Sequence, residues 1–423
     1  MIFAWLPLVL TLSSGCPRAI AAGEVDASAP PATPRDAHPS AAALGAVGGE
    51  IRALLRARSS DHGNLTGAGP WGDRGDLMGL LVRLAFHDAA TFRPPPRPPA
   101  ANANANANAN ATAAASEATG GADGCVDLAS AENGGLREAI DLLEGVRRRA
   151  ADRDEGAAAM SRADVWALAG NVAIEEAGGP RLEYRTGRAD ADDCAGQGER
   201  HVGAESTSSA AIEDAFVREL GLTHGEVVAL IGAHVLGKAT EAHSGYEGKW
   251  VPRNDAFTNA YFVDLLHVPW SRRKADVPTF GERTTWQRFE DRGMSFGDEI
   301  MLQTDVDLAF QTTGGYFCGR VGGAFVPGLS CPNATHAFAP HVWEFARDEE
   351  AWREEFAEGW AKLTSMTASE LRCAAPDCRT PGESFGEPTE SSGAPPPPSR
   401  AAVNGLFSVV GILLINLMSP WRE

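Results

Sequence analysis

The chain has 423 residues, enough for one large domain or for two lobes that share a core. Acidic residues outnumber basic residues by 56 to 37, which gives a formal net charge of −19. Such a charge argues against a nucleic-acid-binding protein, which would carry a basic patch, and fits a soluble acidic protein that could take a cationic partner.

The N-terminus has the pattern of an export signal. An apolar run over residues 2–12 is followed by Ala19-Ile20-Ala21, a small-x-small cleavage pattern, so residues 1–22 are predicted to be a signal peptide. A buried N-terminal helix and a lipoprotein cysteine at Cys16 are the alternatives. Residues 23–43, rich in Ala and Pro, are predicted to be a disordered leader, or the second half of a two-part organelle-targeting leader.

Residues 44–367 are predicted to be the globular domain, and a helical period dominates them. Within residues 76–89, five apolar side chains follow the i, i+3, i+4 spacing of a buried helical face: Leu77, Leu80, Leu81, Leu84 and Ala85. Residues 93–119 contain the repeat ANANANANAN, which cannot bury a core, and are predicted to be a flexible surface insert.

Two further helices carry start and stop signals. Ser161 can cap one helix, which Gly178-Gly179-Pro180 ends. Thr223 and Glu226 form the T-x-x-E capping box of the other. After that box, one helical face carries Val227, Leu230, Ile231 and His234. No comparable set of alternating strands appears, so the predicted fold class is mainly α; residues 267–298 are left without an assigned role.

The cysteines suggest disulfides. Loss of the signal would leave six of the seven cysteines, an even number that is typical of an exported chain. Among the fifteen pairings that six cysteines allow, proximity in sequence favours Cys318–Cys331, Cys373–Cys378 and, by remainder, Cys125–Cys194. Three glycosylation sequons agree with export, at Asn64, Asn110 and Asn333.

The C-terminus changes composition twice. Residues 368–402 form a Pro-, Gly- and Ser-rich linker, and residues 403–418 form an apolar tail. The tail is shorter than the roughly 20 residues of a spanning helix, and with Ser392-Gly393-Ala394 before it the segment also fits a glycolipid-anchor signal. Either interpretation tethers the domain to a membrane; a buried C-terminal helix is the alternative.

Two polar residues interrupt the apolar stretch LVRLAFHDAA. Arg83 and His87 are four residues apart, so a helix places them on one side, one turn apart. Burying these two polar side chains costs free energy of desolvation unless they face a cavity or polar partners. A neutral His87 could act as a general base, and Arg83 could stabilise charge that develops on an oxygen atom. The alternative is a hydrogen-bonded structural pair.

His234 is the second polar interruption. It lies on an apolar face between Gly232 and Gly237, and glycines let a flat ligand approach the backbone. A lone histidine on such a face is more often a satisfied core residue than a ligand. Nevertheless, one helix carries a possible base and a cation, His87 and Arg83, and the other carries a possible ligand, His234. The two helices together suit a metal cofactor held between them. A carboxylate is then expected to accept the other N–H of the His234 imidazole.

These segments resemble a known family. RLAFHDA is similar to the distal motif of the haem peroxidase superfamily of plants, fungi and bacteria, and VVALIGAHVLGKA to its proximal motif. In the family's order, the resemblance continues through ENGGL, GGPRLEYRTGR, HSGYEGKW, FTNAYFVDLL and MLQTDVDLAF. It covers roughly residues 45–367 apart from inserts, and it implies a two-lobed helical fold with haem b between distal and proximal helices.

On the distal side, the resemblance implies three roles. His87 matches the base that takes a proton from hydrogen peroxide, and Arg83 the cation that stabilises the leaving group and then the ferryl oxygen. Asn133 in ENGGL matches the acceptor for the other nitrogen of the distal histidine. Phe86 replaces a tryptophan common in the intracellular branch and is similar to the secretory types.

On the proximal side, His234 matches the axial iron ligand. Asp305 matches the carboxylate that accepts its second N–H, with Asp307 as a competitor. Trp250 matches the tryptophan beneath the haem in the ascorbate and cytochrome c peroxidase branch, and it could carry a radical. This makes that branch the closest one, although a plain core aromatic is the alternative for Trp250.

Contacts at the cofactor edge follow from the same resemblance. Gly232, Gly237, Lys238 and Thr240 are predicted to bind the cofactor, with a solvated Lys238 as the alternative. Thr240 stands where the branch often has a propionate-binding histidine. His243 stands where ascorbate peroxidases carry a substrate-binding arginine, so the resemblance does not decide whether ascorbate is a donor.

A calcium site is also implied. Asp88, Gly121 and Asp123 match the distal calcium site of the secretory types, and hard oxygen ligands suit that ion. Cys125 occupies the usual serine position, and a thiol is a poor calcium ligand. Solvated loop acids are the alternative.

The resulting hypothesis is a secreted or membrane-tethered haem b peroxidase of the secretory pathway, extracellular or lumenal, acting in oxidative stress. It would reduce hydrogen peroxide through ferryl iron and a porphyrin or Trp250 radical. The electron donor would be a small reductant, such as ascorbate or a phenol, or a redox protein. An inactive haem-binding or structural protein is the alternative.

Overall fold

The computed structural model describes residues 39–57, 74–95, 118–195, 208–290, 295–313, 317–319, 331–375 and residue 378. The predicted signal peptide, the predicted tail, Cys16, Asn64 and Asn110 lie outside this part of the chain. So do residues 96–117, the middle of the predicted insert, whose two ends pair as an antiparallel bridge between Arg93 and Thr119.

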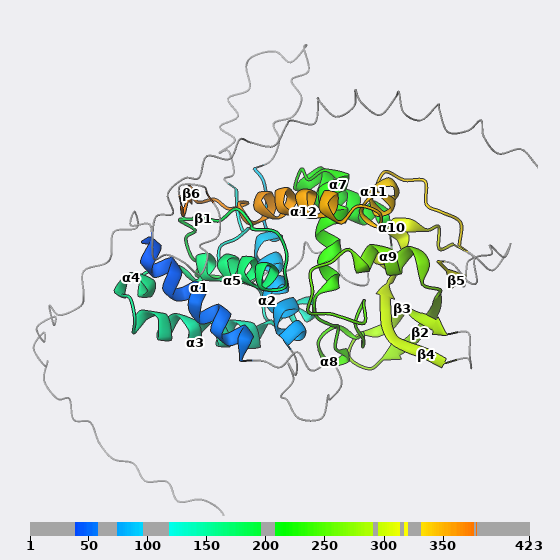
Figure 1. Cartoon of the computed structure of the whole chain (residues 1–423), viewed down its shortest axis with the longest axis horizontal. Coiled ribbons are helices and arrows are strands. Elements are labelled where there is room, and N and C mark those ends of the chain that lie inside the picture. Colours follow the sequence, from blue (N-terminus) through cyan, green and yellow to red (C-terminus); the bar gives the residue numbers. More distant parts are fainter. Residues whose placement is uncertain are drawn as a thin grey trace, which may run out of the picture.

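Helices dominate the described part of the chain and form two groups (Figure 1). The first group contains α1 (Ala41–Arg56), α2 (Arg74–Ala89), α3 (Leu136–Ala151), α4 (Glu155–Ala158) and α5 (Arg162–Glu176). The second contains α7 (His224–Ile231), α8 (Glu241–Ser244), α9 (Ala260–His267), α10 (Gln303–Ala309) and α11 (Ala339–Phe345). This confirms the predicted mainly α fold.

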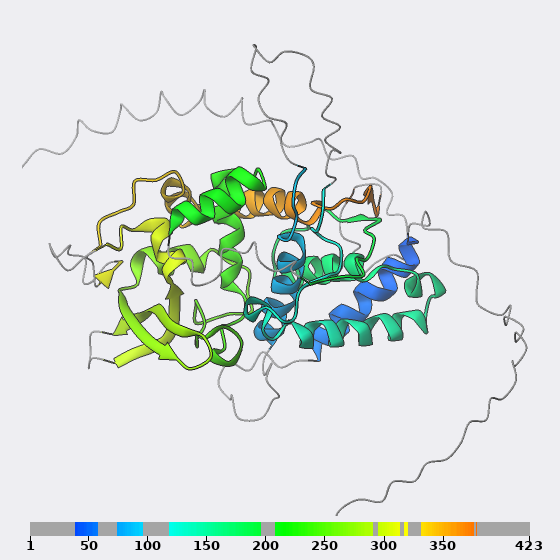
Figure 2. The same ribbon diagram turned by 180° about the vertical axis from the view of Figure 1, so that it is seen from behind.

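One long helix joins the two groups. Helix α12 (Glu349–Thr364) runs along one side of the molecule, packs on α7 and contacts α2, and the view from behind shows the same arrangement (Figure 2). Helix α1 packs on α3 and α5, and α2 packs on α5. Helix α2 therefore lies at the centre, with its apolar residues Leu77, Leu81 and Leu84 fully buried.

The predicted helix signals are confirmed. The Ser161 side chain accepts a hydrogen bond from the backbone N–H of Asp164 at the start of α5, and Thr223 and Glu226 form the complete capping box of α7. Helix α5 ends at Glu176, just before Gly178 adopts a positive φ of 83°. Helix α7 continues into the 3₁₀ turn η3 (Gly232–Val235), which carries His234.

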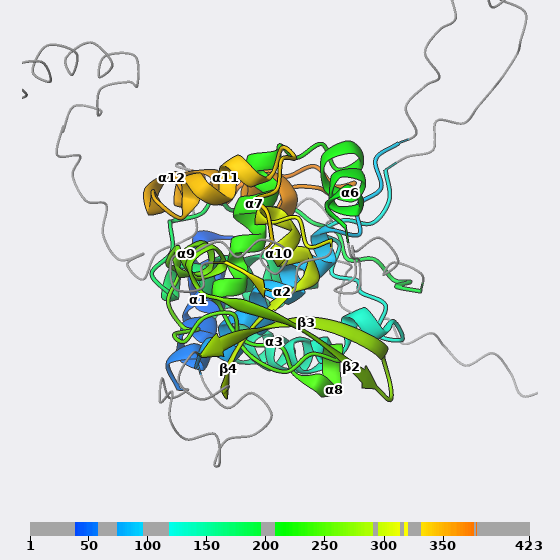
Figure 3. The same cartoon turned by 90° about the vertical axis from the view of Figure 1, so that its right-hand side faces the viewer.

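The region after α9 contains a sheet that the sequence analysis did not predict. Strands β2 (Trp270–Val277), β3 (Gly281–Glu290) and β4 (Ser295–Leu302) form an antiparallel meander, and β5 (Phe317–Cys318) pairs with the other edge of β2. The sheet lies on the opposite side of α2 and α10 from α11 and α12 (Figure 3).

Short elements complete the fold. They are η1 (Ala131–Asn133), β1 (Arg185–Thr186), α6 (Ser209–Ile212), the π-helical turn η2 (Glu213–Glu219) and β6 (Arg372–Cys373). Strand β6 pairs with β1, beyond the predicted domain end at residue 367, and α1 begins at Ala41, ahead of the predicted start at residue 44.

The three predicted disulfides are confirmed: Cys125–Cys194, Cys318–Cys331 and Cys373–Cys378, with Cα–Cα distances of 5.1, 4.8 and 4.5 Å. The sequon residue Asn333 is exposed. Among the described residues, no helix combines the length and the apolar character that crossing a membrane requires.

Candidate active site

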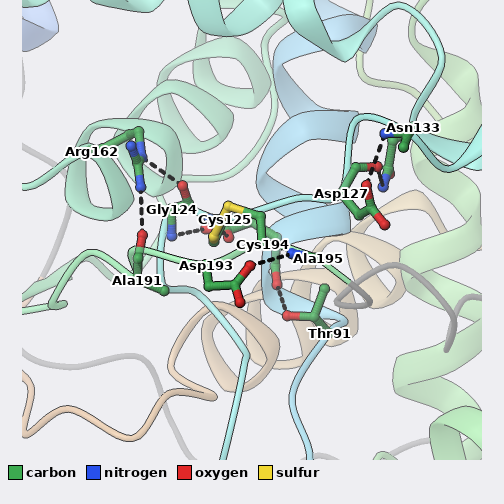
Figure 4. Close-up of a disulfide and its surroundings, with 12 residues drawn as sticks. Thr91, Gly124, Cys125, Asp127, Asn133, Arg162, Ala191, Asp193, Cys194 and Ala195 are labelled. Atoms are coloured by element: carbon green, nitrogen blue, oxygen red, sulfur yellow. Dashed lines mark hydrogen bonds between the residues drawn. A yellow bond between two sulfur atoms is a disulfide. The ribbon is translucent and has the colours of Figure 1, made fainter.

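His87 lies near the end of α2 and is held by Asn133 of η1. The Asn133 Nδ2 group donates to the backbone carbonyl of Asp127 at 2.8 Å, which assigns Oδ1 as the acceptor that faces His87 (Figure 4). The His87 Nδ1–H group donates to this oxygen at 2.8 Å. Because Nδ1 carries the proton, Nε2 is the basic nitrogen of the neutral ring.

Arg83 lies one turn before His87 and points to the same loop. Its guanidinium donates to the backbone carbonyls of Gly134 at 2.7 Å and Glu132 at 2.5 Å. Burial lowers the pKa of Arg83 to about 10, and the nearby Glu132 partly offsets this effect. The side chain therefore keeps its positive charge at neutral pH, close to the base.

Phe86 borders the same face of α2. Its ring lies 6.0 Å from the His87 ring and 5.9 Å from the ring of Phe216 on η2, measured between centroids. Phe216 had no role in the sequence analysis. The two phenylalanines place apolar surface beside the His87 ring.

His234 and Asp305 form the predicted proximal pair. The His234 Nδ1–H group donates to Asp305 Oδ1 at 3.0 Å, although 71 residues separate them in sequence. Asp305 lies in the first turn of α10 and is completely buried. The competitor Asp307 instead accepts hydrogen bonds from Gln303 and Thr312, so Asp305 is the carboxylate behind His234.

Trp250 completes a triad. Its indole ring stacks on the His234 ring with centroids 4.3 Å apart and an interplanar angle of 17°. Its Nε1–H group donates to Asp305 Oδ2 at 2.7 Å. Trp250 is 7% exposed and Asp305 is completely buried, and the structure brings all three predicted proximal residues together in one cluster.

Tyr261 of α9 is a fourth member that the sequence analysis missed. Its hydroxyl donates to Asp305 Oδ1 at 2.8 Å, the same oxygen that His234 uses. The only advance signal is general: a buried tyrosine usually needs a hydrogen-bond partner. Nothing in FTNAYFVDLL indicates that the partner is 44 residues away.

The donors determine the charge state of Asp305. Burial acts to raise its pKa, but the charge and hydrogen bond of His234, the backbone N–H of Leu302 and the indole of Trp250 together hold the pKa below its usual value. Burial and the neighbouring Asp305 charge raise the pKa of Tyr261 well above its usual value, so its proton stays on the phenol.

Gly232 and Gly237, which were predicted to face a ligand, pack closely against other parts of the protein. A Cβ at Gly232 would lie 2.6 Å from the Phe262 ring and 2.8 Å from Trp352 Nε1. Gly237 has a φ of +78°, and a Cβ there would lie 3.0 Å from the Cα of Gly79 on α2. Both glycines therefore allow close packing near His234, and their predicted role beside a flat ligand stays a prediction.

The predicted edge residues also have protein partners. Lys238 Nζ pairs with the buried Asp76 Oδ2 at 3.0 Å. Thr240 Oγ1 lies 2.9 Å from His243 Nδ1, and the His243 ring packs against Gly135, beside the loop that Arg83 contacts. Lys238 is thus engaged with Asp76 rather than solvated, and His243 lies beside the distal loop.

The predicted calcium ligand Asp88 lies against the backbone of Cys125, whose disulfide with Cys194 is drawn in Figure 4. The buried Asp88 carboxylate accepts the backbone N–H groups of Gly124 at 3.0 Å and Cys125 at 2.8 Å, one on each oxygen. The Gly121 N–H group donates to Thr91 Oγ1. Burial raises the pKa of Asp88 well above its usual value, and Asp123 adds to the rise.

This arrangement does not support the predicted calcium ion. Calcium takes six to eight oxygen ligands, whereas both Asp88 oxygens accept N–H groups and Cys125 Sγ is bonded to Cys194. Among the described residues, no group of three or more His, Cys, Asp or Glu side chains has the arrangement of a metal site.

The site fits a haem by its donor chemistry. The His234 side chain is 35% exposed, although Asp305 behind it is fully covered. Its Nδ1 is engaged by Asp305, which leaves Nε2, the atom that an imidazole offers to haem iron. Arg83 and His87 on α2 are also only partly covered, while Leu81 and Leu84 are completely buried.

Comparisons with known proteins agree with this geometry. Residues 65–314 match the family model described as peroxidase. The chain is 29% identical over 300 residues to "Cytochrome c peroxidase, mitochondrial" of Aspergillus fumigatus, covering 70% of this chain and 64% of the relative. It is 30% identical over 213 residues to "Probable L-ascorbate peroxidase 3, peroxisomal" of Oryza sativa, covering 48% and 62%.

A third relative is covered more fully. The chain is 33% identical over 243 residues to "Putative heme-binding peroxidase" of Pyricularia oryzae, covering 56% of this chain and 69% of that protein. For the first two relatives, the chain spans a little under two thirds of their length.

Proposed function

The chain belongs to the haem peroxidase superfamily, nearest the ascorbate and cytochrome c peroxidase branch, and from that premise we propose that it is a haem b enzyme that reduces hydrogen peroxide. Two one-electron donors return it to its resting state. We place this activity in the defence against oxidative stress.

One observation carries the proposal. Asp305 accepts hydrogen bonds from His234 and Trp250 on its two oxygens, while the two rings stack 4.3 Å apart. A carboxylate behind an axial histidine increases the basicity of that ligand. A core that needed only apolar packing would gain nothing from a buried carboxylate, because burying such a charge costs free energy unless it is paired.

A bound haem, held by His234 Nε2, supplies the iron at which peroxide binds and electrons are exchanged. Nε2 of His87 takes the proton from the near oxygen of peroxide and returns it to the departing oxygen. Asn133 keeps this nitrogen basic by accepting from Nδ1. The Arg83 cation stabilises negative charge on the departing oxygen.

Trp250 gives electrons a route into the site. Its ring is stacked on His234, and the Asp305 carboxylate bound to its N–H stabilises positive charge on an oxidised indole. We therefore infer a transient Trp250 radical. The donor classes are a small reductant, such as ascorbate or a phenol, and a redox protein; the relatives named for ascorbate and cytochrome c support both classes.

The three disulfides support an oxidising compartment, so we propose the secretory route, with an extracellular or lumenal location. The membrane tether at residues 403–418 lies outside the described residues and stays a prediction. Calcium is not part of the proposal, because each Asp88 oxygen already accepts a backbone N–H group and Cys125 is in a disulfide.

Stopped-flow absorbance of the hemin-reconstituted protein with hydrogen peroxide tests this function. We expect a fast spectral change in the parent protein, a rate about 10²–10⁴-fold lower in His87→Ala, and a changed radical signal in Trp250→Phe. His224→Ala is the matched control, because His224 pairs with Glu213 at the other end of the helix that leads to His234.

The outcomes separate the hypotheses. A parent protein with a Soret band but no peroxide reaction would leave the inactive haem-binding alternative. No Soret band after hemin addition would leave a structural protein. An equal loss in His87→Ala and His224→Ala would remove the assigned role of His87.

A further inference from the structure

Asp305 has an unusual number of donors for a buried carboxylate. Oδ1 accepts from His234 Nδ1 at 3.0 Å and from the Tyr261 hydroxyl at 2.8 Å. Oδ2 accepts from Trp250 Nε1 and the Leu302 backbone N–H, both at 2.7 Å. Asp305 therefore has four donors, two on each oxygen, and none of its surface is exposed.

The position of the Tyr261 hydroxyl gives it a specific effect. It shares one oxygen with His234, so both donors draw on the same negative charge. A phenol that donates to this oxygen reduces its ability to pull the proton of His234. The imidazole then keeps more of its neutral character than it would with Asp305 Oδ1 to itself.

A purely structural role for Tyr261 would not explain why its hydroxyl contacts Asp305. A phenylalanine would fill the same buried space, and Asp305 would retain three donors without Tyr261. The Tyr261 ring meets the His234 ring edge-on at 6.0 Å, which fixes the phenol relative to the same imidazole. The hydroxyl is therefore placed where it acts on the charge of the proximal pair.

We propose that Tyr261 is a positioning residue that limits the charge Asp305 transfers to His234, and so raises the Fe(III)/Fe(II) reduction potential of the bound haem. This inference rests on the proposed function, because it needs a haem ligated by His234. Tyr261 acts through Asp305 and makes no contact with peroxide. Its hydroxyl opposes the effect of the carboxylate, which favours the ferric state.

Two spectroscopic measurements on hemin-reconstituted Tyr261→Phe test the proposal. Spectroelectrochemistry should give a more negative Fe(III)/Fe(II) midpoint than in the parent protein. Resonance Raman spectra of the ferrous form should show a higher Fe–His stretching frequency, because a more strongly hydrogen-bonded imidazole is a stronger ligand. A shift that changes the oxidised-to-reduced ratio tenfold at fixed potential corresponds to about 59 mV for one electron.

Tyr184→Phe is the matched control. Tyr184 is also buried, and its hydroxyl donates at 2.8 Å to the backbone carbonyl of Asp164, away from Asp305. This variant removes the same group from a different part of the core, so we expect the parent midpoint and the parent Fe–His frequency. An equal shift in both variants would assign the effect to general loosening and overturn the proposal.

A second test does not depend on whether Tyr261→Phe folds. It strengthens the hydrogen bond from the Tyr261 hydroxyl instead of removing it. Replacing the tyrosines with 3-fluorotyrosine makes the phenol a stronger donor without changing the fold, so the midpoint should move to a more positive value. A Tyr184→Phe protein carrying the same label should show the same shift. An unmoved midpoint would contradict the proposal.

The controls also separate this inference from the proposed function. A parent protein with a Soret band, an Fe–His stretch and a peroxide reaction, beside a Tyr261→Phe variant with unchanged midpoint and frequency, overturns the role of Tyr261 alone. A parent protein without an Fe–His stretch overturns both, because His234 would then not be the iron ligand.

Discussion

Two hydrogen bonds in series end at His87, the proposed base. The Asp127 carbonyl orients the Asn133 amide, and the amide oxygen holds the proton on His87 Nδ1. The proton position on an imidazole depends on such a partner. The reactivity of His87 is therefore set by a loop residue 46 positions away in sequence.

Asn133→Val tests these two hydrogen bonds. It removes the acceptor for Nδ1, so the tautomer with a basic Nε2 loses its preference. We expect the rate constant for the peroxide reaction to fall about 100-fold, with haem binding retained because His234 is untouched. Stopped-flow absorbance measures the rate. A rate equal to that of the parent protein would show that Asn133 does not control the tautomer.

Sequence motifs located most of the candidate site but not its connections. Arg83, His87 and His234 are visible as polar interruptions of apolar helical faces, and Asp305 and Trp250 follow from the family resemblance. Tyr261 was missed because its partner is distant in sequence. The sequence could not show that Gly232 packs against Phe262 and Gly237 against Gly79, because these neighbours come from distant segments.

Secondary-structure elements differed in how well the sequence predicted them. Helices α5 and α7 begin at local capping groups, which a short stretch of sequence contains completely. The strands β2 and β3 lack an alternating apolar pattern. Among their side chains whose burial is described, those of Trp270 and Val277 are buried in β2 and that of Trp286 is buried in β3. Their pairing depends on long-range packing that no local pattern records.

The junction of α9 with β3 and β4 carries a partly buried acid, Asp264. Burial raises the pKa of Asp264 to about 6 and Glu299 adds to the rise, while Arg288 acts in the opposite direction. The folded state thus holds the proton to a higher pH than the unfolded state, whose pKa stays near 3.8. Stability therefore falls as the pH rises from about 4 to about 6 and stays lower above that.

Asp264→Asn should remove this penalty. We expect a free energy of unfolding about 1 kcal/mol higher at pH 8, a value reduced for solvent screening of the partly exposed side chain. At pH 3 the gain should vanish, because Asp264 is then neutral in both states. Urea denaturation at the two pH values measures it. A gain of the same size at pH 3 would contradict the assignment.

The loop before η1 is fixed by a disulfide. Cys125–Cys194 joins residues 69 positions apart, and chain entropy predicts a loss of about 4 kcal/mol when both cysteines become serine. Cys373–Cys378 is the matched control, because its separation of 5 residues predicts a loss of about 2 kcal/mol in the free energy of unfolding.

Thermal unfolding of the parent protein should be unaffected by a calcium chelator. A chelator effect as large as that of the serine variant would restore the calcium hypothesis.

The whole molecule carries a net charge of −19, which should attract cationic partners over long distances. If a redox protein is a donor, a cationic cytochrome c should be oxidised about tenfold faster or more at 10 mM than at 150 mM ionic strength, as the screening length falls from about 30 to about 8 Å. Oxidation of a neutral phenol is the control and should not change. A salt-independent cytochrome c rate would contradict electrostatic docking.

The antiparallel bridge between Arg93 and Thr119 has a consequence for protein engineering. Two backbone hydrogen bonds, of 2.7 and 3.1 Å, join these residues, so the two ends of the intervening segment lie side by side. The entropy of closing a loop grows only with the logarithm of its length, so the fold is almost indifferent to the length of chain spliced between them. A reporter protein with adjacent termini could be grafted there, close in sequence to His87, the residue proposed to take the proton of peroxide.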